Sequence, residues 1–194
     1  MERKPAPAVP SVRQLEEELK REKYRGRYKR LLRGTVSTVL VVIAAAVLIS
    51  NLLLPILRIY GSSMSPTLVN GNIVTALRGG SYERGDIVAF YYNDKILVKR
   101  IVGLAGEVID IDEDGSVSVD GEPLDEPYLD EKALGECDIE LPYQVPEGRY
   151  FVMGDNRSVS SDSRSSQVGC VAEEQVIGKL IFRLWPLDGF GTVE

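Results

Sequence analysis

The spacing of apolar and charged residues divides the chain into three parts. Residues 34–57 carry no charge and are mostly apolar. At about 1.5 Å per residue, such a run is long enough to cross the ~30 Å hydrocarbon layer of a bilayer as a helix. A cleavable signal peptide is the alternative, but its apolar core spans only about 7–15 residues after a short basic start. Because 33 residues precede this longer run, we expect an uncleaved transmembrane anchor.

The segment before the anchor, residues 1–33, is basic. It contains eleven Lys or Arg and five Glu, whereas only Arg58 lies close to the other end of the apolar run. By the positive-inside rule, we expect a single-pass protein with a cytoplasmic N-terminus and with residues 58–194 outside the membrane. Glu and Lys residues spaced near four apart predict a helix over much of 11–33. This helix either fixes the topology or binds a partner or the lipid surface.

Residues 58–194 change to the period-two pattern that is typical of strands. Asp114-Gly115 lies between two alternating runs and indicates a hairpin turn. The acidic stretch 120–148 contains four prolines and predicts a loop-rich insertion rather than a second core. The expected fold class is therefore a mainly β extracytoplasmic domain anchored by one N-terminal transmembrane helix. Its expected strands are 72–77, 86–92, 96–103, 107–111, 116–119, 149–153 and 176–185.

The composition limits the chemistry that this domain can perform. The 194 residues include no His and only two Cys, which excludes Ser-His-Asp and Cys-His mechanisms, His-ligated metal sites and four-cysteine zinc sites. We expect neither a metal nor a cofactor. Residues 58–194 carry twelve Lys or Arg against twenty-four Asp or Glu, so the domain would repel nucleic acid. Catalysis must therefore use Ser, Lys, Asp, Glu or Tyr, unless the protein borrows a cofactor.

Four lysines follow the anchor, and Lys99 is the candidate base. Period two places it on the same strand face as Leu97 and Ile101. A lysine buried against apolar side chains loses hydration of its ammonium form, so its pKa falls toward the value that a general base needs. Arg100 looks equally buried on the opposite face, but it cannot release its proton at usable pH. The alternative for Lys99 is a surface lysine whose amine reaches solvent.

The candidate nucleophile lies in the serine-rich segment 60–68, whose sequence is YGSSMSPTL. Gly61 and Pro66 bracket a tight backbone that can expose a hydroxyl and leave N–H groups free for an oxyanion. The alternative is an ordinary serine-rich linker that leaves the bilayer.

Four segments carry motifs in a fixed order along the chain. They are GSSMSPTL at 61–68, RGDIV at 84–88, KRIVGL at 99–104 and GDNRSVSSDSR at 154–164. In this order they resemble the boxes of bacterial type I signal peptidases. The resemblance implies a signal-peptidase-like β fold and a Ser-Lys dyad endopeptidase, with Ser63 as nucleophile and Lys99 as general base. It also implies that the substrates are signal-peptide-bearing preproteins cut at Ala-x-Ala sites and that the protein lies in a bacterial plasma membrane.

The resemblance further implies supporting roles in the fourth segment. Ser160 would hydrogen-bond to Lys99 and orient its amine. An ion-pair network would lie beside the site, built from Asp155, Asp162 and Arg164. Gly61 stands where some members have a Ser that helps to hold the oxyanion, so the Ser63 N–H would need a second donor that the sequence does not identify.

Two other readings, and two structural questions, stay open at this point. The chain could be a related Ser-Lys protease with another task, such as a self-cleaving repressor or a specialised processing peptidase. Self-cleaving repressors are soluble and carry a DNA-binding domain, whereas this chain has an apolar anchor. A noncatalytic envelope scaffold could keep the same fold, although both dyad residues are present. Cys137 and Cys170 would both lie outside the membrane, where they either form a disulfide or remain free thiols. The sequence does not fix the oligomeric state.

Overall fold

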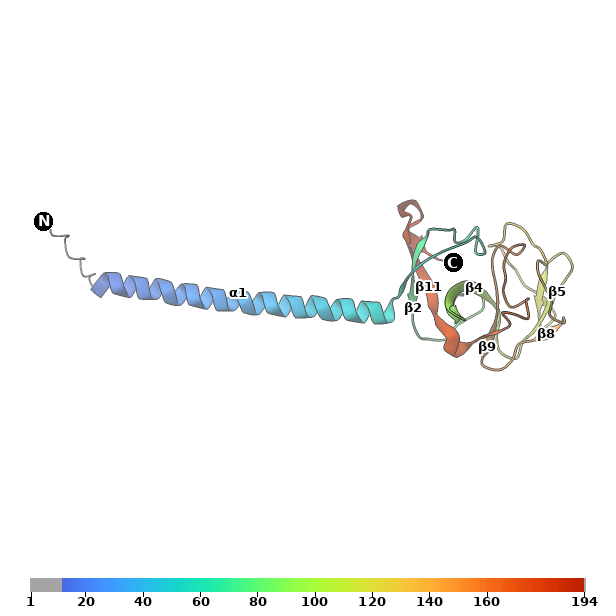
Figure 1. Ribbon diagram of the computed structural model, residues 1–194, viewed down its shortest axis with the longest axis horizontal. Helices are drawn as coiled ribbons and strands as arrows, with labels where there is room; N and C mark the ends of the chain where they lie inside the picture. Colours follow the sequence, from blue (N-terminus) through green and yellow to red (C-terminus); the bar gives the residue numbers. More distant parts are fainter. Residues whose placement is uncertain (1–11, 194) are drawn as a thin grey trace. The chain divides into compact units, whose positions relative to one another are not determined.

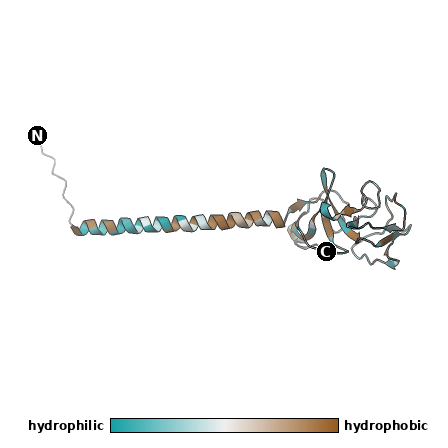
Figure 2. Cartoon of the chain, turned by 90° about the horizontal axis from the view of Figure 1, so that it is seen from below, coloured by the Kyte–Doolittle hydropathy of each residue, from teal (hydrophilic) through white to brown (hydrophobic). Residues whose placement is uncertain are grey.

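The computed structural model describes residues 12–193 and begins with one long helix, α1 (Val12–Leu53). The part of α1 up to Leu48 is long and apolar enough to cross a membrane. Figure 2 shows the change of character along it, from hydrophilic near its start to hydrophobic near its end. The predicted apolar helix is confirmed, and the described part of the basic segment is helical throughout. The first eleven residues of 1–33 lie outside the described range.

The helix ends before the uncharged run does. We expected residues 34–57 to form the anchor, but α1 stops at Leu53. Pro55 follows, and proline lacks an N–H group and disfavours helical backbone in the residue before it. The last apolar residues of the run, Ile56 and Leu57, therefore belong to the first strand, β1 (Ile56–Arg58), and not to the helix.

The chain divides into two compact units, 1–49 and 50–194, and the second contains all the strands. Its larger antiparallel sheet has the order β1-β2-β11-β3-β4-β9-β10, with β12 paired to β11. The smaller antiparallel sheet has the order β7-β6-β5-β8. Figure 1 labels strands of both sheets. The bounds beyond β1 are β2 (Ile73–Leu77), β3 (Ile87–Tyr92), β4 (Lys95–Gly103), β5 (Val108–Ile111), β6 (Val117–Val119), β7 (Glu122–Pro123), β8 (Tyr143–Gln144), β9 (Arg149–Met153), β10 (Val171–Ala172), β11 (Val176–Trp185) and β12 (Gly191–Thr192).

The mainly β fold class is confirmed, and each of the seven expected strands is present with ends shifted by at most one residue. The strands that the sequence did not predict are short, with two or three residues each, and too short to show a period-two pattern. Two of them, β7 and β8, lie in the segment 120–148, which is otherwise irregular between residues 124 and 142. This segment is therefore partly built into the smaller sheet.

Strand β4 is the central element for the chemistry. Its burial changes along its length: Lys95 and Ile96 are exposed, whereas every residue from Lys99 to Gly103 is buried. Strand β3 pairs with it on one side and β9 on the other. Because both faces of its second half are covered, Lys99 and its neighbour Arg100 are both buried, as the sequence pattern indicated.

The two cysteines are free thiols, which answers the question left open by the sequence. Cys170 is buried in the apolar cluster around Val102 and Phe151. Burial raises the pKa of the Cys170 thiol to about 11, so this thiol is protonated and unreactive near neutral pH.

Candidate active site

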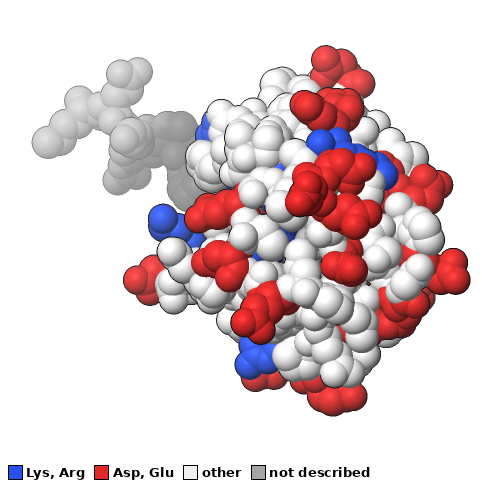
Figure 3. Space-filling model, turned by 90° about the vertical axis from the view of Figure 1, so that its right-hand side faces the viewer, with Lys and Arg blue, Asp and Glu red and all other residues white. Residues whose placement is uncertain are grey.

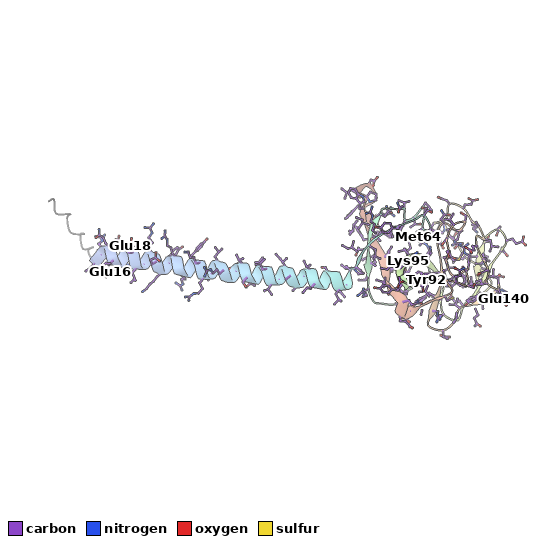
Figure 4. The ribbon with its side chains drawn as sticks, viewed as in Figure 1. Glu16, Glu18, Met64, Tyr92, Lys95 and Glu140 are labelled. Carbon is purple, nitrogen blue, oxygen red and sulfur yellow. The ribbon has the colours of Figure 1, made fainter. Side chains whose placement is uncertain are left out.

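Ser63 and Lys99, the two predicted catalytic residues, line one cleft of about 650 Å³. One wall comes from the segment 56–64, which follows the helix, and the other from 94–99, which contains the start of β4. Met64 and Lys95, both labelled in Figure 4, belong to these two walls. The fold thus brings the serine-rich segment and the lysine strand, more than thirty residues apart in sequence, to the same cavity.

The backbone around Ser63 is held on both sides. Gly61 has φ +86°, in the left-handed region that favours glycine, so the chain can turn sharply just before the serine. After it, the side chains of Met64 and Leu68 are buried in the core. The Ser63 carbonyl oxygen accepts a hydrogen bond of 3.0 Å from the Asn156 N–H. These contacts fix the backbone while leaving the Ser63 side chain half-buried at the cleft.

Lys99 lies in β4 opposite Val88 of β3 and is only 3% exposed. Its side chain makes no hydrogen bond or ion pair with any residue of the described range 12–193. Burial lowers the pKa of Lys99 to about 8, although the nearby carboxylate of Asp162 acts in the opposite direction. Desolvation without a direct counter-ion is the environment in which a lysine can act as a base near neutral pH.

Ser160 is buried near the serine segment but does not make the expected hydrogen bond. Within residues 12–193 the Ser160 hydroxyl makes no hydrogen bond to Lys99; it lies instead toward the Asp162 carboxylate, whose pKa it helps to lower, without reaching hydrogen-bond geometry. Gly154 separates Ser160 from Ser63: a side chain at Gly154 would collide with the Ser160 hydroxyl and the Ser63 carbonyl oxygen. Catalytic hydrogen bonds are often long before substrate binds. The orienting role of Ser160 therefore stays a prediction.

Asp155 joins the lysine strand to the serine segment. It accepts two hydrogen bonds from the Arg100 guanidinium, at 2.9 and 2.8 Å, in a buried ion pair. The Thr67 hydroxyl donates to the same carboxylate at 2.5 Å. Arg100 also donates to the Gly85 carbonyl oxygen at 2.8 Å. Because such bidentate pairs have a fixed geometry, this cluster holds the residue after Lys99 against the segment that carries Ser63.

Asp162 and Arg164 form a second ion pair, and both side chains are fully buried. Arg164 donates to the two carboxylate oxygens at 2.8 Å each, and the Gly154 N–H donates to Asp162 at 3.0 Å. Burial alone would raise the pKa of Asp162, but Arg164 and these hydrogen bonds outweigh it and lower that pKa. A buried charge of this kind is tolerated only because it is paired and hydrogen-bonded.

A third buried ion pair was missed by the sequence analysis. Glu126, from the acidic segment 120–148, accepts hydrogen bonds from Arg157 at 2.5 and 3.3 Å. Tyr128 donates its hydroxyl to Glu126 at 2.9 Å, and its ring centroid lies 3.8 Å from the Arg100 guanidinium carbon. The acidic composition of 120–148 predicted a loop. The one signal in the sequence is that residues 126–128 include a Pro and a Tyr within a stretch rich in acidic residues.

The described residues offer no group of three or more Cys, Asp or Glu side chains that could hold a metal ion. The buried carboxylates of Asp155 and Asp162 are instead paired with arginines. Among the groups that line the cleft, the Ser63 hydroxyl and the Lys99 amine together can support nucleophilic attack and proton transfer.

Comparison with known proteins gives one consistent family. The family model described as "Signal peptidase, peptidase S26" matches residues 32–185. Signal peptidase IB of Staphylococcus aureus is 36% identical over 152 residues, covering 68% of this chain and 78% of that protein. Signal peptidase I of Bacillus licheniformis is 34% identical over 166 residues, covering 79% and 88%. A crystal structure of a signal peptidase I from Enterococcus faecalis V583 is 32% identical, covers 52% of this chain and 97% of that one, and has a TM-score of 0.45. Since the matched family region includes both walls of the cleft and all three buried ion pairs, we conclude that this chain is a serine endopeptidase that belongs to the signal peptidase family, peptidase S26.

Proposed function

We propose that this protein removes N-terminal signal peptides from exported preproteins at Ala-x-Ala sites, with Ser63 as the nucleophile and Lys99 as the general base. The family supports the removal of signal peptides. The observation that carries the dyad is the cleft that Ser63 and Lys99 share, in which Lys99 is desolvated and has no direct counter-ion.

The reaction follows from these two groups. The Ser63 hydroxyl oxygen attacks the scissile carbonyl carbon while the neutral Lys99 amine accepts the hydroxyl proton. The Lys99 ammonium then gives this proton to the leaving amine, the C–N bond breaks, and the signal peptide stays on Ser63 as an ester. The amine, neutral again, takes a proton from water, whose oxygen attacks the ester carbonyl carbon. The C–O bond to Ser63 then breaks, Lys99 returns the proton to the Ser63 oxygen, and the signal peptide leaves as a carboxylic acid.

The oxyanion needs hydrogen-bond donors that the serine segment can supply from its backbone. The Ser63 N–H makes no hydrogen bond to any residue in the described range, so it is free to donate to the oxyanion. The Gly61 N–H already donates to the Asn70 side chain at 3.2 Å, and Gly61 has no side-chain donor. The Ser63 N–H is therefore the first oxyanion donor in this proposal.

The lining of the cleft fits an extended peptide with small residues next to the cut bond. Its walls include Ile59, Met64, Leu97 and Val98, which form an apolar surface between the two segments. Backbone groups of an added peptide strand can pair with such segments, while alternate side chains enter apolar pockets. Small apolar side chains at alternate positions are what an Ala-x-Ala site presents.

The membrane anchor is part of the proposed function. Helix α1 would cross the bacterial plasma membrane once, with the basic residues before it in the cytoplasm. Ser63 follows the end of α1 by only ten residues, so the cleft would meet a preprotein whose apolar stretch remains in the same bilayer. The partners in this proposal are signal-peptide-bearing preproteins and the lipid bilayer, and not nucleic acid.

The proposal is tested by cleavage of a preprotein with an Ala-x-Ala site, using the full chain in detergent. We expect wild type to cut after the second Ala and Ser63→Ala and Lys99→Ala to be inactive but folded. Ser62→Ala and Lys132→Ala are matched controls, because both side chains are exposed and outside the dyad. Cleavage by Ser63→Ala would show that another group is the nucleophile. Absence of cleavage of several preproteins by wild type would show that the activity lies elsewhere.

A further inference from the structure

In the part of the chain that the structure describes, most Lys and Arg side chains of the β domain make a hydrogen bond or an ion pair, and a few do not. The domain is acidic, and Figure 3 shows Asp and Glu spread over one of its faces. Eight of its twelve Lys and Arg donate to a carboxylate, a carbonyl or a hydroxyl. The four that make no hydrogen bond or ion pair within residues 12–193 are Arg58, Arg78, Lys95 and Lys99. Three of these four line the catalytic cleft, so unpaired positive charge is concentrated there.

Arg58 and Lys95 line the cleft and each precedes one of the two proposed catalytic residues along the chain. Arg58 ends β1, five residues before Ser63, and Lys95 begins β4, four residues before Lys99. Both side chains are exposed. The Arg58 guanidinium carbon lies 5.6 Å from the centroid of the Tyr60 ring. Asp94 is the one acidic residue that lines the cleft, which leaves the cleft with an excess of positive charge.

A preprotein would pass Arg58 and Lys95 before its cut bond reaches Ser63. Its apolar stretch precedes the cut bond and remains in the bilayer. Strand β1 begins three residues after the last residue of α1, so the end of the cleft at 56–58 is the end nearest the anchor along the chain. A strand rises about 3.3 Å per residue, so Lys95 is about 13 Å from Lys99 along β4. In an extended peptide, the residue that lies beside Lys95 would therefore be roughly the fifth residue before the cut bond.

We propose that Arg58 and Lys95 form a charge-selecting subsite that favours preproteins with an acidic residue, and disfavours those with a basic residue, roughly five positions before the cut bond. This inference rests on the proposed function and on the direction in which the peptide enters. The charges are exposed and therefore partly screened by water and salt, so the selectivity is modest. We expect the Glu and Lys forms of a preprotein to differ about two- to fivefold in kcat/KM at low ionic strength.

The experiment uses the full chain in neutral detergent and three preproteins that differ only in having Glu, Gln or Lys at this position. Wild type is expected to cut the Glu form fastest and the Lys form slowest, with a difference that shrinks at high salt. Lys95→Glu should abolish or reverse the order. The control is Lys132→Glu, which makes the same charge change at an exposed lysine outside the cleft and should keep the order.

The outcomes separate this inference from the function on which it rests. If wild type cuts none of the three preproteins, the proposed function is wrong. If it cuts all three at equal rates, the function stands and the subsite does not. A second arm repeats the assay in vesicles that contain anionic lipid. If Lys95→Glu keeps the wild-type order in detergent and slows all three forms equally in these vesicles, the cations bind the lipid surface and the inference is overturned.

Discussion

The burial of Lys99 has a consequence for stability that can be measured apart from activity. The folded protein holds this amine with a pKa of about 8, whereas the ordinary value is 10.5. Because the charged form is disfavoured in the folded state, Lys99 destabilises the fold below pH 10.5, partly between about 8 and 10.5 and fully below about 8. The difference between the two pKa values corresponds to a loss of at most about 3 kcal/mol in the free energy of unfolding. Each tenfold change in proton affinity contributes about 1.4 kcal/mol.

Replacing Lys99 by Met keeps much of the side-chain volume and removes the charge. We therefore expect Lys99→Met to be inactive yet more stable than wild type at pH 7, by up to about 3 kcal/mol. Folding of wild type releases a proton between the folded pKa of about 8 and the unfolded value of 10.5, so the wild-type stability rises over that pH window. The advantage of Lys99→Met should shrink by the same amount over the same window.

The assay is urea unfolding of the full chain in detergent at pH 7, 8, 9 and 10, followed by near-UV circular dichroism. Lys132→Met is the control, since its side chain is exposed and such substitutions change stability by about 0.5 kcal/mol or less. A Lys99→Met protein that is no more stable than wild type at pH 7 would refute the reasoning. So would a stability difference that is the same at pH 7 and pH 10, because titration of the lysine could not then be its cause.

Three further substitutions test the framework around the dyad. Gly154→Ala should lower activity and lower the free energy of unfolding by about 1–3 kcal/mol, because the new methyl meets the Ser63 carbonyl oxygen, whereas a methyl at Gly191 meets nothing. Equal stability and activity of Gly154→Ala and Gly191→Ala would contradict this. Glu126→Ala should lower the free energy of unfolding, measured in urea, by about 3–5 kcal/mol, because it leaves the buried Arg157 guanidinium unpaired. Glu140→Ala is the control and should change little, since the Glu140 side chain is exposed. An unchanged unfolding midpoint would show that this pair does not stabilise the fold. Thr67→Val should lower the free energy of unfolding by about 1.5–3 kcal/mol, because it removes a hydrogen bond to the buried Asp155 carboxylate, and it should also lower kcat. If both values stay unchanged, this hydrogen bond does not hold the serine segment in place.

The sequence predicted those parts of the site that follow from local pattern. Period two and the apolar neighbours in 95–103 placed Lys99 in a buried strand, because burial in a sheet depends on alternation that a single strand displays. The sequence pattern could not show that only one of Lys99 and Arg100 is buried. The structure gives the reason: the second half of β4 is covered on both faces, so both side chains are buried. Only the chemistry of the two side chains distinguishes their roles.

The parts that the sequence did not predict depend on contacts between distant segments. Glu126 and Tyr128 lie in an acidic, proline-containing stretch that has the composition of a solvated loop, yet they pack on two arginines of the site. The sequence did not show that the helix ends at Leu53, because Ile56 and Leu57 are as apolar as the helix before them and only pairing with β2 makes them a strand. The missing hydrogen bond of Ser160 depends on the position of one hydroxyl, which no sequence pattern specifies.

The central claim is that a buried, neutral lysine activates Ser63, and the pH dependence of kcat/KM for an Ala-x-Ala preprotein tests it most directly. At pH 7 an amine with a pKa of about 8 is about one-tenth neutral, whereas at the ordinary value of 10.5 only about 0.03% would be neutral. The account predicts a tenfold fall in kcat/KM for each pH unit well below about 8, a plateau above it, and no activity in Lys99→Arg at any pH. A flat profile between pH 6 and 9, or an active Lys99→Arg, would contradict it.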